Sequence, residues 1–227
     1  MTTTTLDTNI FLYSIISETC AKKVESTYKK SNFNIVLRTV YYETRPKLLE
    51  LSSIFSVLLS EISKTRNYLK LIDSNFYDVF KSKYPQIYAS FRNFILKNKI
   101  GMKERPYLIS VVTNILDDIA SIIQMISSPK IIYPSEDNEK NILESREFEF
   151  ANKKLSKIIS NKNDLVHLSL CYCYVSINLK HKNQIFFVTL DKKHFLKNKE
   201  TIEKEIKNLI IQSMPKLDIE NIKLKII

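Results

Sequence analysis

The sequence predicts an α/β protein whose central sheet is parallel and covered by helices on both faces. Short β-branched and apolar segments alternate with longer segments that carry apolar residues at helical spacing, which is typical of βαβ units. The segment 184–191, QIFFVTLD, is a continuous apolar run of strand length, which favours a strand buried on both faces. Ligands bind such sheets at the carboxyl ends of the strands, so functional residues are expected at that edge.

The first forty residues predict two strands separated by helices. Threonines and a leucine favour a strand, and the apolar NIFLYSII after Asp7 favours a buried helix. We expect the next helix to begin around Glu43, with Pro46 allowing a bend or a fresh first turn. The predicted order is strand 2–6, helix 9–16, polar helix 20–30 and strand 32–39.

The rest of the chain predicts stacked helices and then a return to the sheet. Residues 47–127 carry apolar residues at a spacing of three to four throughout, which indicates several amphipathic helices. A break follows at 129–140, with room for a short extended segment. The remaining predicted elements are an amphipathic helix 139–159, a helix 161–179, the strand 184–191, a basic helix ending near 213 and a last strand 219–227.

Composition excludes several classes of protein. A single glycine, Gly101, rules out Walker loops and other glycine-rich phosphate cradles. The three cysteines form no CxxC pair, so neither a disulfide framework nor a cysteine zinc site is indicated. The best membrane-span candidate, 107–126, is interrupted by Asp117 and Asp118, and no secretory signal opens the chain. We therefore expect a soluble, cytoplasmic protein with no membrane association.

The net charge indicates a class of partner. Thirty-five Lys and Arg against 24 Asp and Glu give a formal charge of +11 over 227 residues, which suits nucleic acid or another polyanion. A general bias toward lysine explains the same number equally well, so charge alone does not decide between them.

Four acids stand where strands end or helices begin. Asp7 and Asp191 follow apolar strands directly, Glu43 opens the helix after the second strand, and Asp164 lies in the first turn of another helix. Carboxylates gathered at one sheet edge repel each other unless a divalent cation compensates them, and Mg²⁺ or Mn²⁺ prefers such oxygen-rich sites. Taken singly, three of the four acids could instead be helix N-caps, and Glu43 a solvated helix residue.

The segments around these acids resemble one family of proteins. LDTNIFLYS, NIVLRTVYYET, NKNDLVHLSLCYCYV and above all FFVTLDKKHF resemble the motifs of PIN-domain ribonucleases, including the VapC-like toxins. The resemblance implies a three-layer α/β/α sandwich that cleaves RNA with Mg²⁺ or Mn²⁺ held by Asp7, Glu43, Asp164 and Asp191. It gives Thr8, Asn9 and Thr189 orienting roles, and assigns none to His167 or His194.

The resemblance also bears on domain organisation and partners. It implies a single domain, 1–227, in which 47–128 is a helical insertion or arm longer than the family usually has. It implies an antitoxin protein as partner and a homodimer. The lysines after the fourth acid could contact RNA phosphates, although any one of them is more often an ordinary solvated side chain. These are Lys192, Lys193, Lys197 and Lys199.

Two other functions fit parts of the pattern. One is a non-catalytic PIN-like module that uses its helical insertion to bind RNA or a protein. The other is a phosphatase of the haloacid dehalogenase type, which needs a second aspartate two positions after the first, where this chain has Asn9.

Overall fold

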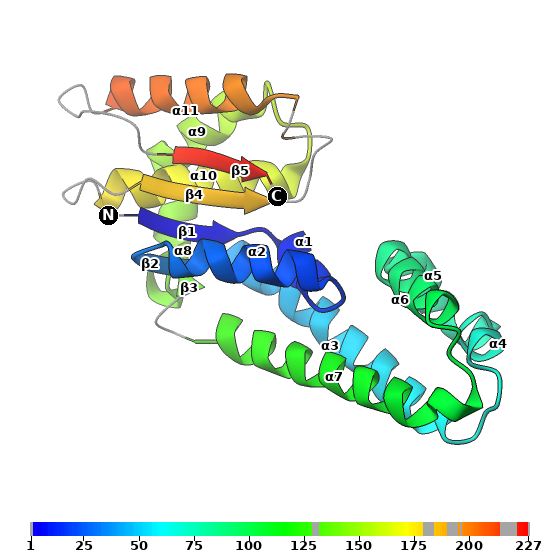
Figure 1. Cartoon of the computed structure of the whole chain (residues 1–227). Helices are drawn as coiled ribbons and strands as arrows, with labels where there is room; N and C mark the ends of the chain where they lie inside the picture. The colour runs from blue at the N-terminus through cyan, green and yellow to red at the C-terminus, as the bar shows by residue number, and fades with distance from the viewer. Residues whose placement is uncertain are drawn as a thin grey trace.

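A parallel sheet forms the centre of the molecule. The computed structural model describes residues 2–128, 132–178, 184–189, 195, 197–213 and 222–226. Its five strands lie in the order β3-β2-β1-β4-β5, and each neighbouring pair is parallel (Figure 1). The predicted α/β class with a parallel central sheet is therefore confirmed. The strands are β1 Thr2–Leu6, β2 Phe33–Leu37, β3 Ile132–Tyr133, β4 Gln184–Thr189 and β5 Ile222–Ile226.

Helices make up most of the remaining described residues. The amino-terminal helices are α1 Thr8–Ser14, α2 Glu18–Lys29 and α3 Arg38–Ile62. The middle of the chain contains α4 Tyr68–Ile72, η1 Asn75–Tyr77, α5 Asp78–Lys83, α6 Pro85–Lys97, η2 Met102–Glu104 and α7 Arg105–Ile126. The carboxyl-terminal half contains α8 Glu136–Leu143, α9 Arg146–Leu155, α10 Lys162–Asn178 and α11 Lys199–Ser213.

Two helices differ from their predicted bounds. α3 begins at Arg38, directly after β2, and runs through Pro46 without interruption, so the expected start near Glu43 was too late. No side chain caps its first turn, which is why the sequence gives no start signal there. The single helix predicted over 139–159 is two helices, because the Ser145 hydroxyl accepts a hydrogen bond from the Phe148 amide at 3.2 Å and starts α9 afresh.

Helices α3 to α7 form an arm that extends from the sheet. α3 and α7 run side by side away from the strands, and α4, α5 and α6 pack near their outer part (Figure 1). Phe55 of α3 meets Phe80 and Phe91 edge-on, with ring centroids 5.6 and 5.4 Å apart. The buried apolar side chains of the arm and of the sheet belong to one continuous cluster. The predicted start of the insertion, residue 47, lies inside α3.

One helical stretch, Met102–Ile126, is long and apolar enough to cross a membrane. Its most apolar 18-residue window has a mean hydropathy of 1.5, and 22% of that window is buried. Core helices of soluble proteins can meet the same criteria of length and composition, so this observation alone identifies no membrane span.

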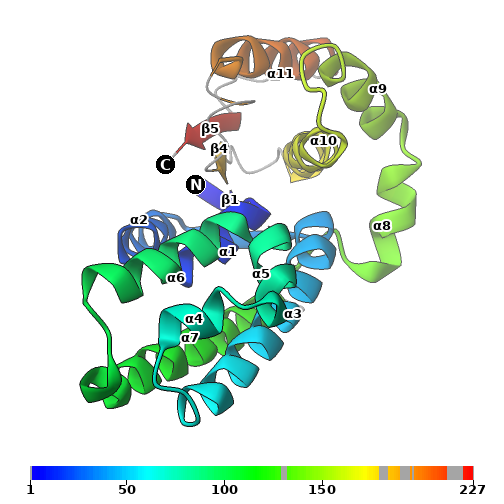
Figure 2. The ribbon, with the colours of Figure 1, turned by 90° about the vertical axis from the view of Figure 1, so that its right-hand side faces the viewer.

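The sheet brings the carboxyl ends of β1 and β4 together. Leu6 lies beside Val188 in the parallel register, and the amide of Asp7 donates to the Val188 carbonyl at 2.9 Å. α10 packs on β4, and in Figure 2 the arm lies below the strands and α11 above them. α10 also contacts α3, which contacts α1, so these three helices meet beside the carboxyl end of β1.

Candidate metal centre

Two donors orient the carboxylate of Asp7 at the edge of the sheet. It is the N-cap of α1, and its Oδ1 accepts a hydrogen bond from the Thr8 amide at 2.7 Å. Oδ2 accepts from the Thr189 hydroxyl at 2.8 Å, which ties the carboxylate to the end of β4. Asp7 is 4% exposed, so these donors hold a buried carboxylate in one orientation. Asp7 therefore is a helix N-cap, as one of the two interpretations predicted, and it also lies close to Asp164 and His167.

Glu43 reaches the same place from α3. Its Oε2 accepts from the Thr8 hydroxyl at 3.1 Å, and its Oε1 accepts from Lys47 Nζ at 2.7 Å. Glu43 and Lys47 are four residues apart on one helix face, the spacing at which such pairs meet. The Thr44 hydroxyl donates to that of Thr8 at 3.3 Å, so Thr8 connects α1 with α3.

Asp164 and His167 enter the site from the first turns of α10. The Asn161 side chain accepts from the amides of Asn163 and Asp164, at 2.9 and 3.3 Å, and so takes the capping position. Asp164 lies in the first turn of α10 behind this cap, and it is only 7% exposed. His167 lies three residues further along the helix, on the same face, and is 2% exposed.

Two acids and the histidine form a compact group. One oxygen each of Asp7 and Asp164 and one nitrogen of His167 lie within 4.8 Å of one another, and all three residues are buried. His167 Nδ1 is 3.7 Å from Asp7 Oδ1, and Nε2 is 3.9 Å from Glu43 Oε2. Carboxylate oxygens and imidazole nitrogens are common ligands of divalent cations. The group can therefore hold a metal ion.

A cavity of about 180 Å³ opens onto the two acids of this group. Its lining comes from α1 and its N-cap, α3 and the start of α10, and includes three of the four predicted acids and their neighbours. The lining residues are Asp7, Thr8, Asn9, Leu12, Glu43, Lys47, Asn161, Asn163 and Asp164. A small ligand or a hydrated cation reaching this cavity would meet the carboxylates directly.

The protonation states suit a cation. Burial raises the pKa of Glu43, but the hydrogen bond and charge of Lys47 outweigh it and hold the pKa below its ordinary value. Burial lowers the pKa of His167 to about 4, although the Glu43 charge opposes the shift. At neutral pH the site therefore offers an ionised Glu43 and a neutral imidazole with a lone pair.

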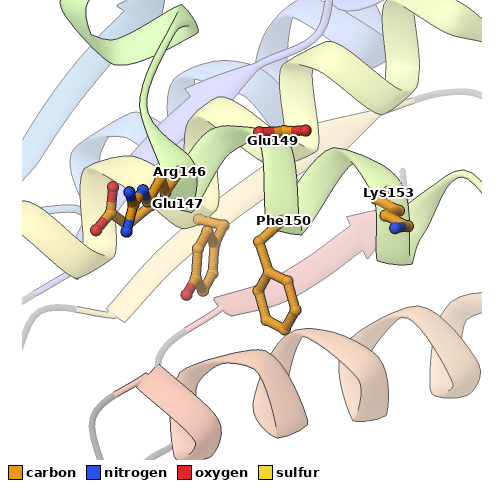
Figure 3. A pocket seen from close by; sticks show the side chains of 6 residues that line it. Arg146, Glu147, Glu149, Phe150 and Lys153 are labelled. Carbon is orange, nitrogen blue, oxygen red and sulfur yellow. The ribbon is translucent and has the colours of Figure 1, made fainter.

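A second, larger cavity lies beside α9 (Figure 3). It measures about 410 Å³, and its lining combines both signs of charge with aromatic rings. The lining residues are Arg146, Glu147, Glu149, Phe150, Lys153 and Tyr172. The cluster suited to a cation lies in the other cavity, so the larger one is not our candidate site.

Most of the predicted site residues converge. Asp7, Glu43 and Asp164 line one cavity together with Thr8 and Asn9, and Thr189 contacts Asp7. Asn9 Nδ2 donates to the Thr189 hydroxyl at 3.4 Å, an orienting contact. Asp191, Lys192 and Lys193 lie outside the described residues, and Lys197 is exposed between β4 and α11.

Two members of the site were not predicted from the sequence. His167 was given no role, although its spacing of three from Asp164 was the signal that could have identified it. Lys47 was not named as a member of the site, although its spacing of four from Glu43 predicts the observed ion pair.

Comparison with protein-family models, curated proteins and solved structures gives no match.

Proposed function

We propose that the protein is a metal-dependent endoribonuclease of the PIN type. The observation that carries the proposal is the convergence of Asp7, Asp164 and His167 at the carboxyl edge of a parallel sheet, with Glu43 in the same cavity. Asp191 is the predicted fourth acid. Mg²⁺ or Mn²⁺ bound there would lower the pKa of a water molecule and offset the charge that develops on the scissile phosphate.

The residues of the chain would prepare this chemistry before RNA arrives. Thr8 and Thr189 donate to the carboxylates of Glu43 and Asp7 and fix their orientation. Lys47 Nζ lies at the cavity beside Glu43, where a cation suits an approaching phosphate. Preorganised groups of this kind need little rearrangement during the reaction, which favours catalysis.

The finer parts of the proposal rest on separate observations. A three-layer α/β/α sandwich agrees with the parallel sheet and with helices that pack on its strands. RNA as substrate agrees with the formal charge of +11. A role as the toxin of a toxin–antitoxin pair and a homodimer rest on the family resemblance, and a cytoplasmic location rests on the composition of the chain.

The decisive experiment compares RNA cleavage by matched Asp→Asn variants in Mn²⁺. Asp7→Asn and Asp164→Asn keep the side-chain size but remove a charged cation ligand, so we expect losses of at least about 100-fold in rate. Asp137→Asn is the control, because Asp137 is an exposed acid in the first turn of α8.

Circular dichroism would show whether each variant is folded. Equal cleavage by the parent and all three variants would refute the nuclease proposal. RNA binding with no cleavage by the parent, and no uptake of Mn²⁺, would favour the non-catalytic binding module instead.

A further inference from the structure

His167 is a buried polar side chain whose environment is incomplete. It is 2% exposed, and within the described part of the chain its Nδ1 has no hydrogen-bond partner. The nearest carboxylate oxygen, Asp7 Oδ1, is 3.7 Å away, too far for a hydrogen bond. Buried polar groups normally have partners, so an imidazole nitrogen directed at a carboxylate without bonding to it indicates that something else fits between them.

A metal ion fits the spacing of the three ligand atoms. An ion bound at about 2.1 Å holds adjacent octahedral ligands about 3.0 Å apart and opposite ones about 4.2 Å apart. The three ligand atoms lie within 4.8 Å of one another, and His167 Nδ1 is 3.7 Å from Asp7 Oδ1, so adjacent ligands of an octahedral ion would have to move closer by less than about 2 Å. A carboxylate and a histidine three residues apart on one helix, as Asp164 and His167 are, also form the metal-binding pair of di-iron helix bundles.

We propose that His167 is a nitrogen ligand of the bound ion and makes the site prefer Mn²⁺ to Mg²⁺. This inference rests on the proposed metal-dependent function. Mg²⁺ takes oxygen ligands and tolerates little departure from octahedral geometry, whereas imidazole is a favourable ligand for first-row transition metals. Carboxylates suit both ions, so the imidazole would add to the preference for Mn²⁺.

The contacts of His167 also give Glu43 a role. With Nδ1 at the ion, the proton of the imidazole is on Nε2, which lies 3.9 Å from Glu43 Oε2. A carboxylate facing the second nitrogen of a metal-bound histidine orients the ring and raises its basicity. Glu43 would thus act on the ion through His167 as a positioning residue, with Thr8 and Lys47 holding its carboxylate in place.

The test measures metal binding directly and does not depend on activity. Calorimetry on the full chain gives the dissociation constants of Mn²⁺ and Mg²⁺. Pulsed electron paramagnetic resonance of the Mn²⁺-loaded protein, with histidines labelled with nitrogen-15, reports a histidine nitrogen bonded to the ion. The variants are His167→Gln, which removes the imidazole, Glu43→Gln, and Ser169→Ala as control for a buried change in the same helix.

We expect Mn²⁺ to bind the parent at least tenfold more tightly than Mg²⁺, with a histidine nitrogen coupling. His167→Gln should lose the coupling, and its ratio of the Mg²⁺ to the Mn²⁺ dissociation constant should fall at least fivefold. Glu43→Gln and Ser169→Ala should keep the coupling. Tight Mn²⁺ binding without the coupling, or an unchanged preference in a folded His167→Gln protein, would overturn the role of His167 and leave the metal site standing. Failure of the parent to bind either ion would overturn this inference and the proposed function together.

Discussion

The hydroxyl of Thr189, at the end of β4, donates to Asp7 Oδ2 at 2.8 Å and accepts from Asn9 Nδ2 at 3.4 Å. Thr189 is fully buried, so water cannot replace it as a donor. A threonine is needed there because its hydroxyl can donate to a carboxylate while its methyl group packs in the sheet.

Replacing Thr189 by valine should therefore destabilise the protein. A hydrogen bond to a charged group is worth about 1.5–3 kcal/mol, and we expect the free energy of unfolding to fall by about that amount in urea titrations. Thr5→Val is the control, because Thr5 is equally buried and, among the described residues, its hydroxyl has no hydrogen-bond partner. Removing that hydroxyl should be neutral or stabilising. Equal losses in the two variants would contradict the argument.

The sequence shows the acids of the site more clearly than the histidine. Asp7, Glu43 and Asp164 could be predicted because each stands at the end of a strand or the start of a helix, positions that a fold pattern brings to one edge. His167 lies within an apolar helix, at a spacing typical of core residues. The sequence alone therefore does not show whether this histidine packs in the core or binds a ligand. Only the crossing of α10 past α1 and α3 shows which groups its nitrogens face.

At the scale of elements, the arm depends on aromatic packing around α3. Phe55 is fully buried and contacts the rings of Phe80 and Phe91 edge-on. Truncating a buried phenylalanine removes its burial energy and leaves a cavity, at a cost of about 3–5 kcal/mol. We expect Phe55→Ala to lose that much unfolding free energy in urea, with Val57→Ala as control. Val57 lies on the same helix but is 39% exposed, so its loss should stay within about 0.5 kcal/mol.

A partly exposed ion pair joins α4 to α6 and should respond to acid. Asp73 accepts from Arg92 Nε at 3.0 Å and from Nη2 at 3.1 Å, and Tyr88 donates to the same carboxylate. The hydrogen bond from Arg92 lowers the pKa of Asp73, and burial opposes it. The pKa of Asp73 is lower in the folded state than in the unfolded state. The ion pair therefore makes its full contribution to the free energy of unfolding above the ordinary pKa of about 3.9, and it loses that contribution as the pH falls toward the pKa of the folded state.

The prediction is a stability difference that disappears in acid. Thermal melts from about pH 6 to about pH 3 should show the parent above Asp73→Asn at the upper end, with the two curves converging below about pH 4. The effect should be small because both side chains are about a third exposed, 38% for Arg92 and 35% for Asp73. A constant difference across the whole range would mean that the Asp73 charge is not what stabilises the contact.

The types and order of the elements could be predicted because composition and hydrophobic spacing differ clearly between segments. The threonine-rich β1 follows from its β-branched residues, the apolar β4 from its continuous apolar run, and the helical arm from a period of about 3.6. Boundaries were harder where no capping residue marks them, as at Arg38, or where one apolar pattern continues through a cap, as at Ser145. A pattern of burial identifies a helix face, but a local hydrogen bond decides where the helix ends.

For the whole molecule, the formal charge of +11 predicts how RNA binding depends on salt. If binding neutralises about five phosphates, the affinity for single-stranded RNA should fall about 100-fold between about 50 and 200 mM salt. Fluorescence anisotropy with a labelled single-stranded RNA, in the absence of divalent ions so that cleavage does not interfere, measures the slope. Binding that does not change with salt would contradict an electrostatic role for the lysines.

A single lysine should change that slope by a definite amount. Lys197 is exposed and follows the predicted fourth acid. Each phosphate contact on single-stranded RNA adds about 0.7 to the slope of log affinity against log salt concentration. Lys197→Gln should therefore reduce the magnitude of that slope by about 0.7. Lys22→Gln is the matched control, because Lys22 is exposed on α2 and pairs with Glu18 at 2.6 Å. Identical slopes for the parent and both variants would remove Lys197 from the RNA path. An equal reduction in both variants would show that binding depends on overall charge and not on the position of Lys197.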